Sequence, residues 1–169
     1  ICLEGWSKIN HSFSLICRRK LIELAKLPID LKYKETNYLN PNWNEVVNYN
    51  GFSQSDNSKI ELIHKAKKDE FFDLIYRIEY PYNFIKGNSK KLFIFGTSEF
   101  QNIEGMFRNE IPANFSKRED LNIITTSNWS KIGFVQSGFN SDQVKVVPCG
   151  VDTNTFYPIS LERKKKIRK

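Results

Sequence analysis

Short apolar runs and amphipathic stretches alternate along most of the chain, most clearly near its C-terminal end. The runs at 121–125 (LNIIT) and 143–148 (QVKVVP) are rich in apolar β-formers and bounded by polar residues, which is typical of buried parallel strands. Four apolar residues recur between them at helical spacing: Trp129, Ile132, Phe134 and Val135. Ser127 or Asn128 can cap this helix, and Gly138 can end it. The stretch predicts a strand, a helix and a second strand, with both strands parallel in one sheet.

The rest of the chain continues this alternation. Strands are predicted at 1–4, 29–35, 71–78 and 91–96, and helices at 11–27, 59–68 and 101–108. Residues 36–58 are rich in asparagine and aromatic side chains, so we expect a long loop there with one short helix near 43–48. The pattern predicts an α/β fold of the Rossmann-like, doubly wound kind, built on a mainly parallel sheet with ligands at the C-terminal ends of its strands.

The length and composition indicate the number of domains and the cellular compartment. A chain of 169 residues that is 40% hydrophobic can bury one sizeable core, so we expect one domain. The cysteines Cys2, Cys17 and Cys149 are scattered and form no CxxC pair, which favours reduced thiols in a cytoplasmic protein over disulfides or a zinc site. No apolar run approaches the length of a membrane span, and no signal peptide opens the chain. Because Ile1 stands in place of an initial methionine, we expect a fragment of a longer protein.

The net charge of +7 is concentrated at one end of the chain. Residues 162–169 (ERKKKIRK) hold six basic residues and one acid, a net charge of +5, which leaves about +2 for the remainder. A basic terminal run is most often a solvated helix or a frayed tail, and less often a surface for anionic lipid or nucleic acid. The charge alone therefore identifies no partner.

Polar residues gather in the turns that follow the predicted strands. These turns meet at one edge of a parallel sheet and cover residues 5–12, 77–82, 97–100 and 126–129. The first turn precedes a helix N-terminus, where free N–H groups favour an anionic oxygen. Its candidate ligand-binding residues are Gly5, Ser7, Asn10 and His11. The alternative is an ordinary capped helix with His11 as its cap or as a surface residue, and the GxGxxG fingerprint of dinucleotide oxidoreductases is absent.

Five short phrases follow one another between residues 126 and 158. They are Thr126-Ser127-Asn128-Trp129, Ser137-Gly138, Val146-Val147-Pro148, Gly150-Val151-Asp152 and Phe156-Tyr157-Pro158. In this order they resemble the end of the N-terminal domain of retaining GT-B glycosyltransferases, especially family 4, the group 1 transferases. Two positions depart from that pattern, since Cys149 stands where asparagine or histidine is usual and Asn128 where glutamate is common.

The resemblance implies a division of the chain and a reaction. Residues 1–158 would be the N-terminal, acceptor-side domain of a GT-B fold, and residues 159–169 the basic start of the linker to a C-terminal domain. In the family that second domain holds most of the donor nucleotide, so this chain alone is expected to be inactive. The complete protein would move a hexose from a nucleotide-sugar to a hydroxyl acceptor, with retention of configuration.

The resemblance also implies the partners. The nucleotide-sugar donor is a substrate, so neither a cofactor nor a metal is expected. The acceptor would be a glycan, a lipid or a surface polymer, and the third partner would be the protein's own C-terminal domain. A cytoplasmic location is expected, with peripheral contact to the cytoplasmic face of an anionic membrane left open, and nucleic acid is not expected as a partner.

Residue roles follow from the same resemblance. The first turn, with Gly5, Ser7, Asn10 and His11, would lie beside the donor sugar and its diphosphate. Many family members carry a histidine after the strand at 91–96, whereas the only histidines here are His11 and His64. Glu99 is the candidate catalytic residue at that turn, because a carboxylate there can orient a sugar hydroxyl or act on the acceptor; the alternative is a helix cap. Candidate acceptor-binding residues are Arg77, Glu79, Thr97, Ser98 and Ser127.

Three structural expectations stand beside these roles. Arg77 and Glu79 flank Ile78 in a predicted strand, so an ion pair between them is the alternative to acceptor contact. His64 is expected to be solvated in a lysine-rich helix, and Trp129 is expected to pack under the sheet.

Two other classes of protein remain as alternatives. One is a non-catalytic Rossmann-like binding module that has lost the chemistry, which the missing histidine favours. The other is a basic nucleic-acid-binding domain, which the net charge and the aromatic side chains suggest.

Overall fold

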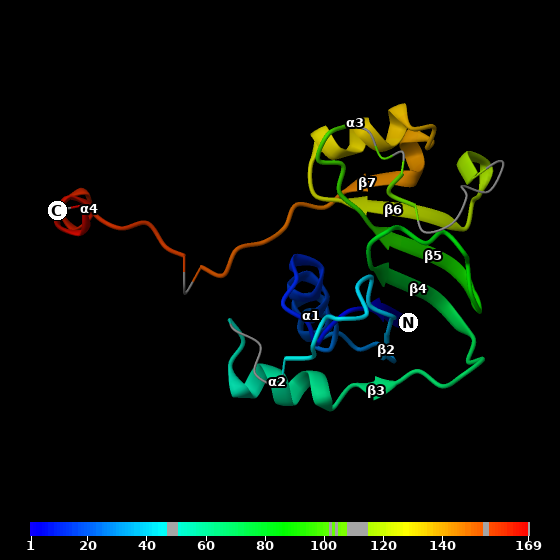
Figure 1. The fold of residues 1–169 in the computed structure, drawn as a ribbon, viewed down its shortest axis with the longest axis horizontal. Coiled ribbons are helices and arrows are strands. Elements are labelled where there is room, and N and C mark those ends of the chain that lie inside the picture. The colour runs from blue at the N-terminus through cyan, green and yellow to red at the C-terminus, as the bar shows by residue number, and fades with distance from the viewer. Residues whose placement is uncertain (47–50, 102, 104, 108–114, 154–155, 169) are drawn as a thin grey trace.

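Parallel strands form one seven-stranded sheet in the computed structural model, which describes residues 1–46, 51–101, 103, 105–107, 115–153 and 156–168 (Figure 1). The strands are β1 (Cys2–Gly5), β2 (Lys32–Glu35), β3 (His64–Lys65), β4 (Phe72–Ile78), β5 (Ser89–Phe95), β6 (Leu121–Thr125) and β7 (Val144–Val146). Their order across the sheet is β3-β2-β1-β4-β5-β6-β7, and each of these pairs is parallel. The predicted Rossmann-like, doubly wound α/β fold is confirmed.

Helices cover the two faces of the sheet separately. α1 (Ser12–Leu24) and α2 (Gln54–Glu61) pack on one face, and α3 (Asn128–Gln136) packs on the other together with the β4–β5 connection. Strands β1 to β3 are added in one direction and β4 to β7 in the opposite one, and right-handed crossovers then place their connections on opposite faces. Two 3-10 turns, η1 (Phe115–Lys117) and η2 (Ser141–Gln143), precede β6 and β7.

Successive residues of the central strands enter different halves of the core. Cys2 packs with Ile75 and Phe134 on the α3 side of the sheet, whereas Leu3 packs with Leu21 on the α1 side. Because both faces are covered, most positions of the central strands are apolar, and the buried charged residues among them, Glu4 and Arg77, pair with each other. This is why short apolar runs mark these strands in the sequence.

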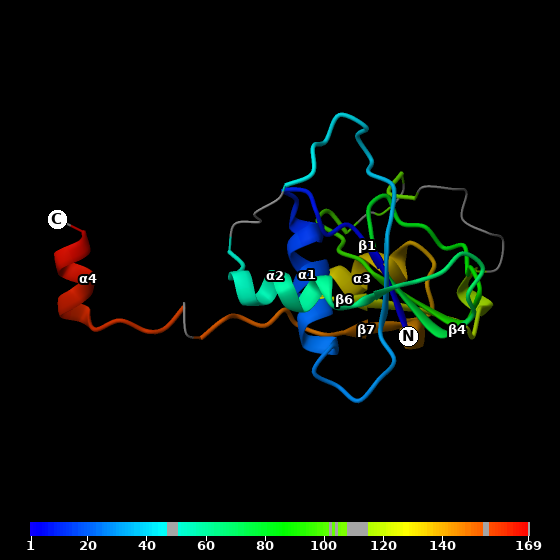
Figure 2. The same ribbon diagram turned by 90° about the horizontal axis from the view of Figure 1, so that it is seen from below.

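The direction of strand addition reverses between β1 and β4, which are neighbours in register from Cys2↔Ile75 to Gly5↔Ile78. In open parallel sheets, ligands bind outside the carboxyl ends of the strands at such a reversal. We call this side of the sheet the carboxyl edge; it is formed by the residues that follow β1, β4, β5 and β6, namely 6–11, 79–82, 96–101 and 126–127. Figure 2 shows the loop that follows β2 rising at this side.

The helices on the α1 side differ from their predicted bounds. α1 ends at Leu24, three residues earlier than expected. α2 begins at Gln54 instead of residue 59 because Ser53 and Asp56 form a capping box there, and it ends at Glu61. His64 therefore lies in the edge strand β3, not in a helix, although it is exposed as expected.

Two predicted helices are not found among the described residues. Residues 43–46 are not helical, and residues 47 and 48 lie outside the described chain. Within 101–108, the described residues 101, 103 and 105–107 are not helical either. Gln101 and Gly105 have φ angles of 55° and 80°, in the left-handed region that a right-handed helix does not admit.

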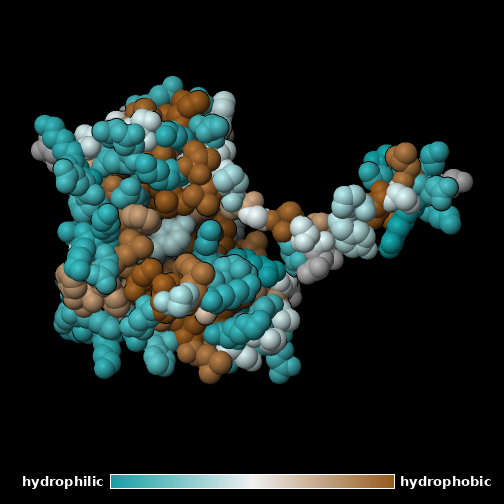
Figure 3. All heavy atoms as spheres, turned by 180° about the vertical axis from the view of Figure 1, so that it is seen from behind, coloured by the Kyte–Doolittle hydropathy of each residue, from teal (hydrophilic) through white to brown (hydrophobic). Residues whose placement is uncertain are grey.

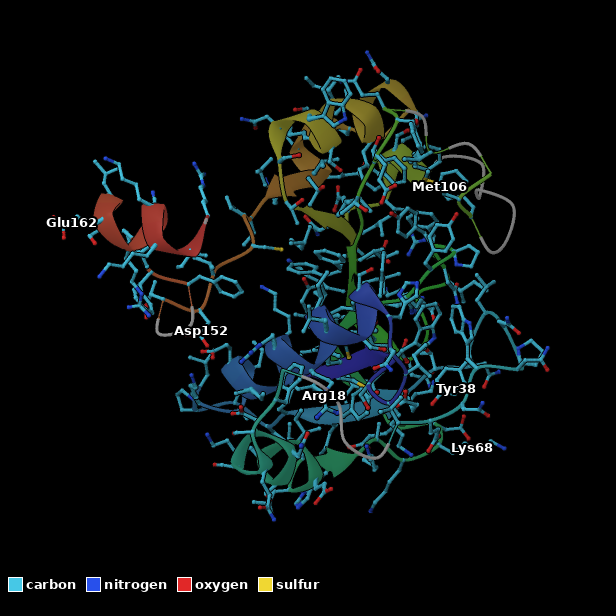
Figure 4. The ribbon with its side chains drawn as sticks, turned by 60° about the vertical axis from the view of Figure 1, so that its left-hand side comes forward. Arg18, Tyr38, Lys68, Met106, Asp152 and Glu162 are labelled. Carbon is cyan, nitrogen blue, oxygen red and sulfur yellow. The ribbon has the colours of Figure 1, made fainter. Side chains whose placement is uncertain are left out.

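The chain beyond β7 runs away from the sheet and carries α4 (Leu161–Ile167) at its far end (Figure 1). Every described residue from 147 to 168 is exposed except the half-buried Ile159. Figure 4 shows Asp152 and Glu162 on this tail, away from the domain, and Figure 3 shows apolar residues along it. A domain boundary at residue 158 stays a prediction. Among the described residues, no helix has the length and apolar character needed to cross a membrane.

Candidate functional site at the carboxyl edge

The first turn of the carboxyl edge is tied to the end of β2. The backbone N–H of Ser7 donates to Glu35 Oε1 (2.8 Å), and the Ser7 hydroxyl donates to Glu35 Oε2 (2.7 Å). The Tyr33 hydroxyl lies between Glu35 Oε2 (2.5 Å) and the carbonyl oxygen of Gly5 (2.8 Å). From the helix side, Arg18 Nη1 donates to the Ser7 carbonyl (2.9 Å). The candidate ligand residue Ser7 is thus buried and holds the shape of the turn.

Gly5, at the end of β1, lies where β1, β4 and α1 come closest. A Cβ on Gly5 would lie 2.6 Å from the carbonyl oxygen of Ile78 and 3.2 Å from Cys17 Sγ. Glycine is therefore required for the packing of β1 against β4 and α1. Asn10, in contrast, is exposed at the same edge.

His11 is the N-cap of α1. Its Nδ1 accepts a hydrogen bond from the backbone N–H of Phe13 (3.1 Å), so the neutral imidazole carries its proton on Nε2. The ring lies against two tryptophans, with centroid distances of 5.1 Å to Trp6 and 5.3 Å to Trp43. Burial among these groups lowers the pKa of His11 below its ordinary value of 6.5. The cap interpretation of His11 accounts for this geometry.

The protonation of His11 is expected to make stability depend on pH. The unfolded chain takes up the proton near pH 6.5 and the folded chain only at lower pH, so stability is complete above about pH 6.5 and is lost as the pH falls through the folded pKa. The physical cause is the burial of the imidazole, which disfavours its charged form, and a proton on Nδ1 would also remove the acceptor for the Phe13 N–H. Urea unfolding at pH 7.5 and 5.5 measures the effect. His11→Asn, which keeps a cap oxygen but does not titrate there, should lose less stability across this range. Equal losses would contradict the prediction.

The loop after β2 closes over the first turn through tryptophan contacts. Trp6 is fully buried, and its indole Nε1–H donates to the Asn37 carbonyl (3.1 Å). Trp43 lies on Trp6 with a centroid distance of 5.4 Å and an interplanar angle of 81°. The sequence predicted a long loop at residues 36–58 but did not assign a partner to either tryptophan. An aromatic residue directly after a strand was the available signal.

Arg77 and Glu79 lie in and after β4, but the closest acidic partner of Arg77 is Glu4 in β1. Its Nε and Nη2 approach Glu4 Oε2 to 2.8 and 2.7 Å, whereas Glu79 Oε1 is 3.9 Å from Nε. The third guanidinium nitrogen donates to the carbonyls of Asn83 and Ile85, both at 2.7 Å. Both members of the Arg77–Glu4 pair are almost fully buried. The Arg77–Glu4 pair therefore links β1 and β4 to each other and to the β4–β5 connection. The sequence did not indicate Glu4 as a partner of Arg77.

The turn after β5 is fixed to its neighbours by backbone hydrogen bonds. The Tyr82 hydroxyl donates to the Thr97 carbonyl (2.6 Å) and accepts from the Thr97 N–H (2.8 Å). The N–H of the buried Ser98 donates to Ser130 Oγ in α3 (2.7 Å). Ser127 is the N-cap of α3, as predicted, and its Oγ accepts from the Ser130 N–H (3.2 Å). The carboxyl ends of β5 and β6 thus form one rigid unit with α3.

Two aromatic side chains and a carboxylate project from this unit. Glu99 and Phe100 are exposed, and Trp129 is 56% exposed in the first turn of α3. The expectation that Trp129 packs under the sheet is wrong. The small residues Ser130 and Gly133, with Phe134, face the sheet instead, because α3 approaches the 98–101 turn closely.

Two hollows open on the surface of the described residues. A hollow of about 330 Å³ runs along the outer side of α3, and one of about 300 Å³ lies at the opposite edge of the sheet, near Ile1 and Asp73.

Among the described residues, no cluster of three His, Cys, Asp or Glu side chains could hold a metal ion. All three cysteines are unpaired thiols, and burial with the nearby Glu4 charge raises the pKa of Cys2 to about 12.

Comparison of the chain with protein-family models, with curated proteins and with solved structures finds no match. The residues and the geometry described above are therefore the basis for the function proposed next.

Proposed function

We propose that this chain is the N-terminal, acceptor-side domain of a retaining GT-B glycosyltransferase. The observation that carries the proposal is the place where the chain leaves the sheet. β7 is parallel to β6, and the Val147 N–H donates to the Thr125 carbonyl (2.7 Å), so residues 148–152 depart from the carboxyl edge. A second domain attached there would face the turns after β1, β4, β5 and β6. The site would then lie in a cleft between two domains, whose closure excludes water.

The reaction transfers a sugar from a nucleotide-sugar to an acceptor hydroxyl. A bond forms between the anomeric carbon and the acceptor oxygen, the bond from that carbon to the diphosphate breaks, and the acceptor proton leaves with the nucleoside diphosphate. The N-terminus of α1, capped by His11, would lie beside the diphosphate, because its N–H groups and dipole favour negative charge. The donor nucleotide would be held by the second domain, so this chain alone is proposed to be inactive.

The exposed members of the edge would contact the substrates. Asn10 and Glu99 are exposed, so they can exchange hydrogen bonds with a sugar. Ser7 and Arg77 are committed to buried contacts and would act by positioning the first turn and the β4–β5 connection. Contact of the basic, exposed α4 with an anionic membrane is part of the proposal as a peripheral interaction.

A non-catalytic binding module is the second candidate. It is favoured by the composition of the edge, because the chain's two histidines, His11 and His64, lie in the α1 cap and in edge strand β3. No histidine follows β5, where many of the resembled transferases have one.

Transfer assays on the longer protein that includes the second domain test the proposal. With a panel of UDP-, GDP- and ADP-sugars and glycan or lipid acceptors, we expect product from the long protein and none from the 169-residue chain. Glu99→Gln should lower kcat/KM for the acceptor about 10- to 100-fold, the value of a hydrogen bond to a charged group. The control Glu119→Gln, an exposed glutamate before β6 at the opposite edge, should be unchanged. Binding of a nucleotide-sugar without turnover would instead identify the binding module.

A further inference from the structure

We propose that Trp129, Phe100 and Glu99 form a platform that binds one sugar ring of the acceptor. This inference rests on the proposed transferase function. It specifies an acceptor that contains a sugar ring and the residues that recognise this ring. The platform consists of the two exposed aromatic side chains and the carboxylate between the ends of β5 and β6.

The platform is mounted on a rigid junction. Ser98 and Gln101, on either side of Glu99 and Phe100, pack against α3 so closely that a Cβ on Gly133 would lie 2.9 Å from Gln101 Cα. Trp129 precedes Gly133 by four residues, so it flanks the face of α3 that packs on the sheet, one turn nearer the carboxyl edge. The Ser98 N–H also donates to Ser130 Oγ (2.7 Å). The backbone that carries the platform is therefore held in place before a ligand arrives, which lowers the entropy cost of binding.

The exposure of these aromatic side chains has no explanation in the packing of the domain. Phe100 is 79% exposed and Trp129 is 56% exposed, whereas Trp6, Tyr82 and Phe134 are almost completely buried. Tryptophan is rarely left so exposed, because its large apolar surface gains most from burial. A single exposed apolar residue needs no explanation, but two exposed aromatic side chains on adjoining turns form an apolar surface of the kind that binds a ligand or a partner.

The chemistry of the platform fits a sugar ring. One face of a hexose carries C–H groups, which pack on an aromatic ring, while its rim carries hydroxyls, which need charged or amide oxygens as acceptors. Glu99 supplies such a carboxylate beside Phe100, and the exposed amide of Asn128 adjoins Trp129. A two-fold contact centred on Glu99 would bring the carboxylate of a second copy against it, which is unfavourable. The platform also lies on the carboxyl edge, where a substrate is expected.

Tryptophan fluorescence tests binding without any turnover. Trp6 is buried and Trp43 is half-buried, so acrylamide reaches Trp129 most easily. Methyl glycosides of glucose, galactose, mannose and N-acetylglucosamine are added at millimolar concentration to the whole chain. We expect at least one of them to reduce acrylamide quenching, and Phe100→Ala, which keeps the Trp129 fluorophore, to weaken or abolish that protection. No protection by any glycoside would count against the platform.

Acceptor kinetics in the longer protein provide the second readout. Trp129→Ala should raise KM for the acceptor about ten-fold, or about 1.4 kcal/mol, while hydrolysis of the donor in the absence of acceptor stays the same. The matched control is Phe71→Ala, an aromatic that is 62% exposed just before β4 at the opposite edge of the sheet, and it should change neither value.

The two readouts separate the failure of the platform from the failure of the transferase proposal. Glycoside protection without transfer by any donor would support the platform and overturn the transferase. Transfer with an acceptor KM that Trp129→Ala leaves within two-fold would overturn the platform alone. Sedimentation of the parent as a dimer that Trp129→Ala dissociates, with no glycoside effect, would replace the sugar by a second copy of the chain.

Discussion

Replacing Arg77 with methionine is expected to lower the free energy of unfolding by about 3–5 kcal/mol, the usual loss when one partner of a buried ion pair is removed. Among the described residues, the change leaves the Glu4 carboxylate, 5% exposed, with only the largely exposed Lys34 ammonium, at 3.2 Å, as a cationic partner. It also removes the donor that serves the carbonyls of Asn83 and Ile85. Urea unfolding followed by circular dichroism measures the loss.

Two further proteins identify the cause. The double variant Glu4→Leu, Arg77→Met removes the Glu4 charge as well, so that only the buried Glu79 carboxylate, 3.9 Å from Arg77 Nε, still loses the guanidinium. Its loss should therefore be smaller than for Arg77→Met alone. Arg163→Met makes the same chemical change in the exposed helix α4 and should alter stability by less than about 0.5 kcal/mol. A loss below about 1 kcal/mol for Arg77→Met would show that the pair does not hold the reversal between β1 and β4 together.

Trp6→Ala is expected to cost about 3–5 kcal/mol of unfolding free energy, as for other large aromatic residues removed from a core. Trp6 is fully buried directly after β1, and it contacts Trp43 and the ring of His11 at centroid distances of 5.4 and 5.1 Å. Its indole also holds the loop after β2 through the Asn37 carbonyl. Faster cleavage within residues 36–46 in limited proteolysis should accompany the loss.

Trp43→Ala serves as the matched control. Because Trp43 is only half-buried, its replacement should lower the free energy of unfolding less than Trp6→Ala does. Trp6→Phe keeps most of the packing but removes the N–H, so its effect should lie between those of the parent and Trp6→Ala. If Trp6→Ala and Trp43→Ala lost equal stability, the aromatic cluster would be held by the loop and not by the first turn.

These two predictions concern residues at the carboxyl edge that hold it together. Ser7 and Arg77 have the composition of ligand-binding residues, yet their polar groups meet Glu35 and Glu4 inside the protein. Glu99, in the same kind of turn, is exposed. Sequence position after a strand therefore located the edge, but it did not separate the residues that support the site from those that can touch a substrate.

The sequence by itself determined the fold class and several local features. Apolar or alternating runs predicted the positions of β1, β2 and β4 to β7, because burial of a strand favours apolar residues on the faces that are covered. Local chemistry determined the ends of α3, where Ser127 caps the helix and Gly138 takes a φ of 98°. These features depend on residues that are near one another in the chain, so a short stretch of sequence is enough to predict them.

The tertiary structure alone decided which distant residues meet. Arg77 and Glu4 are 73 positions apart, and Ser7 and Glu35 are 28 apart. Their contact follows from the register of β1 with β4 and β2, which no local pattern specifies. Trp129 is exposed for a similar reason, since the approach of Gly133 to Gln101 orients α3 on the sheet. The sequence determined the elements from local periodicity, whereas the pairing of the strands determined the buried pairs and the exposed platform.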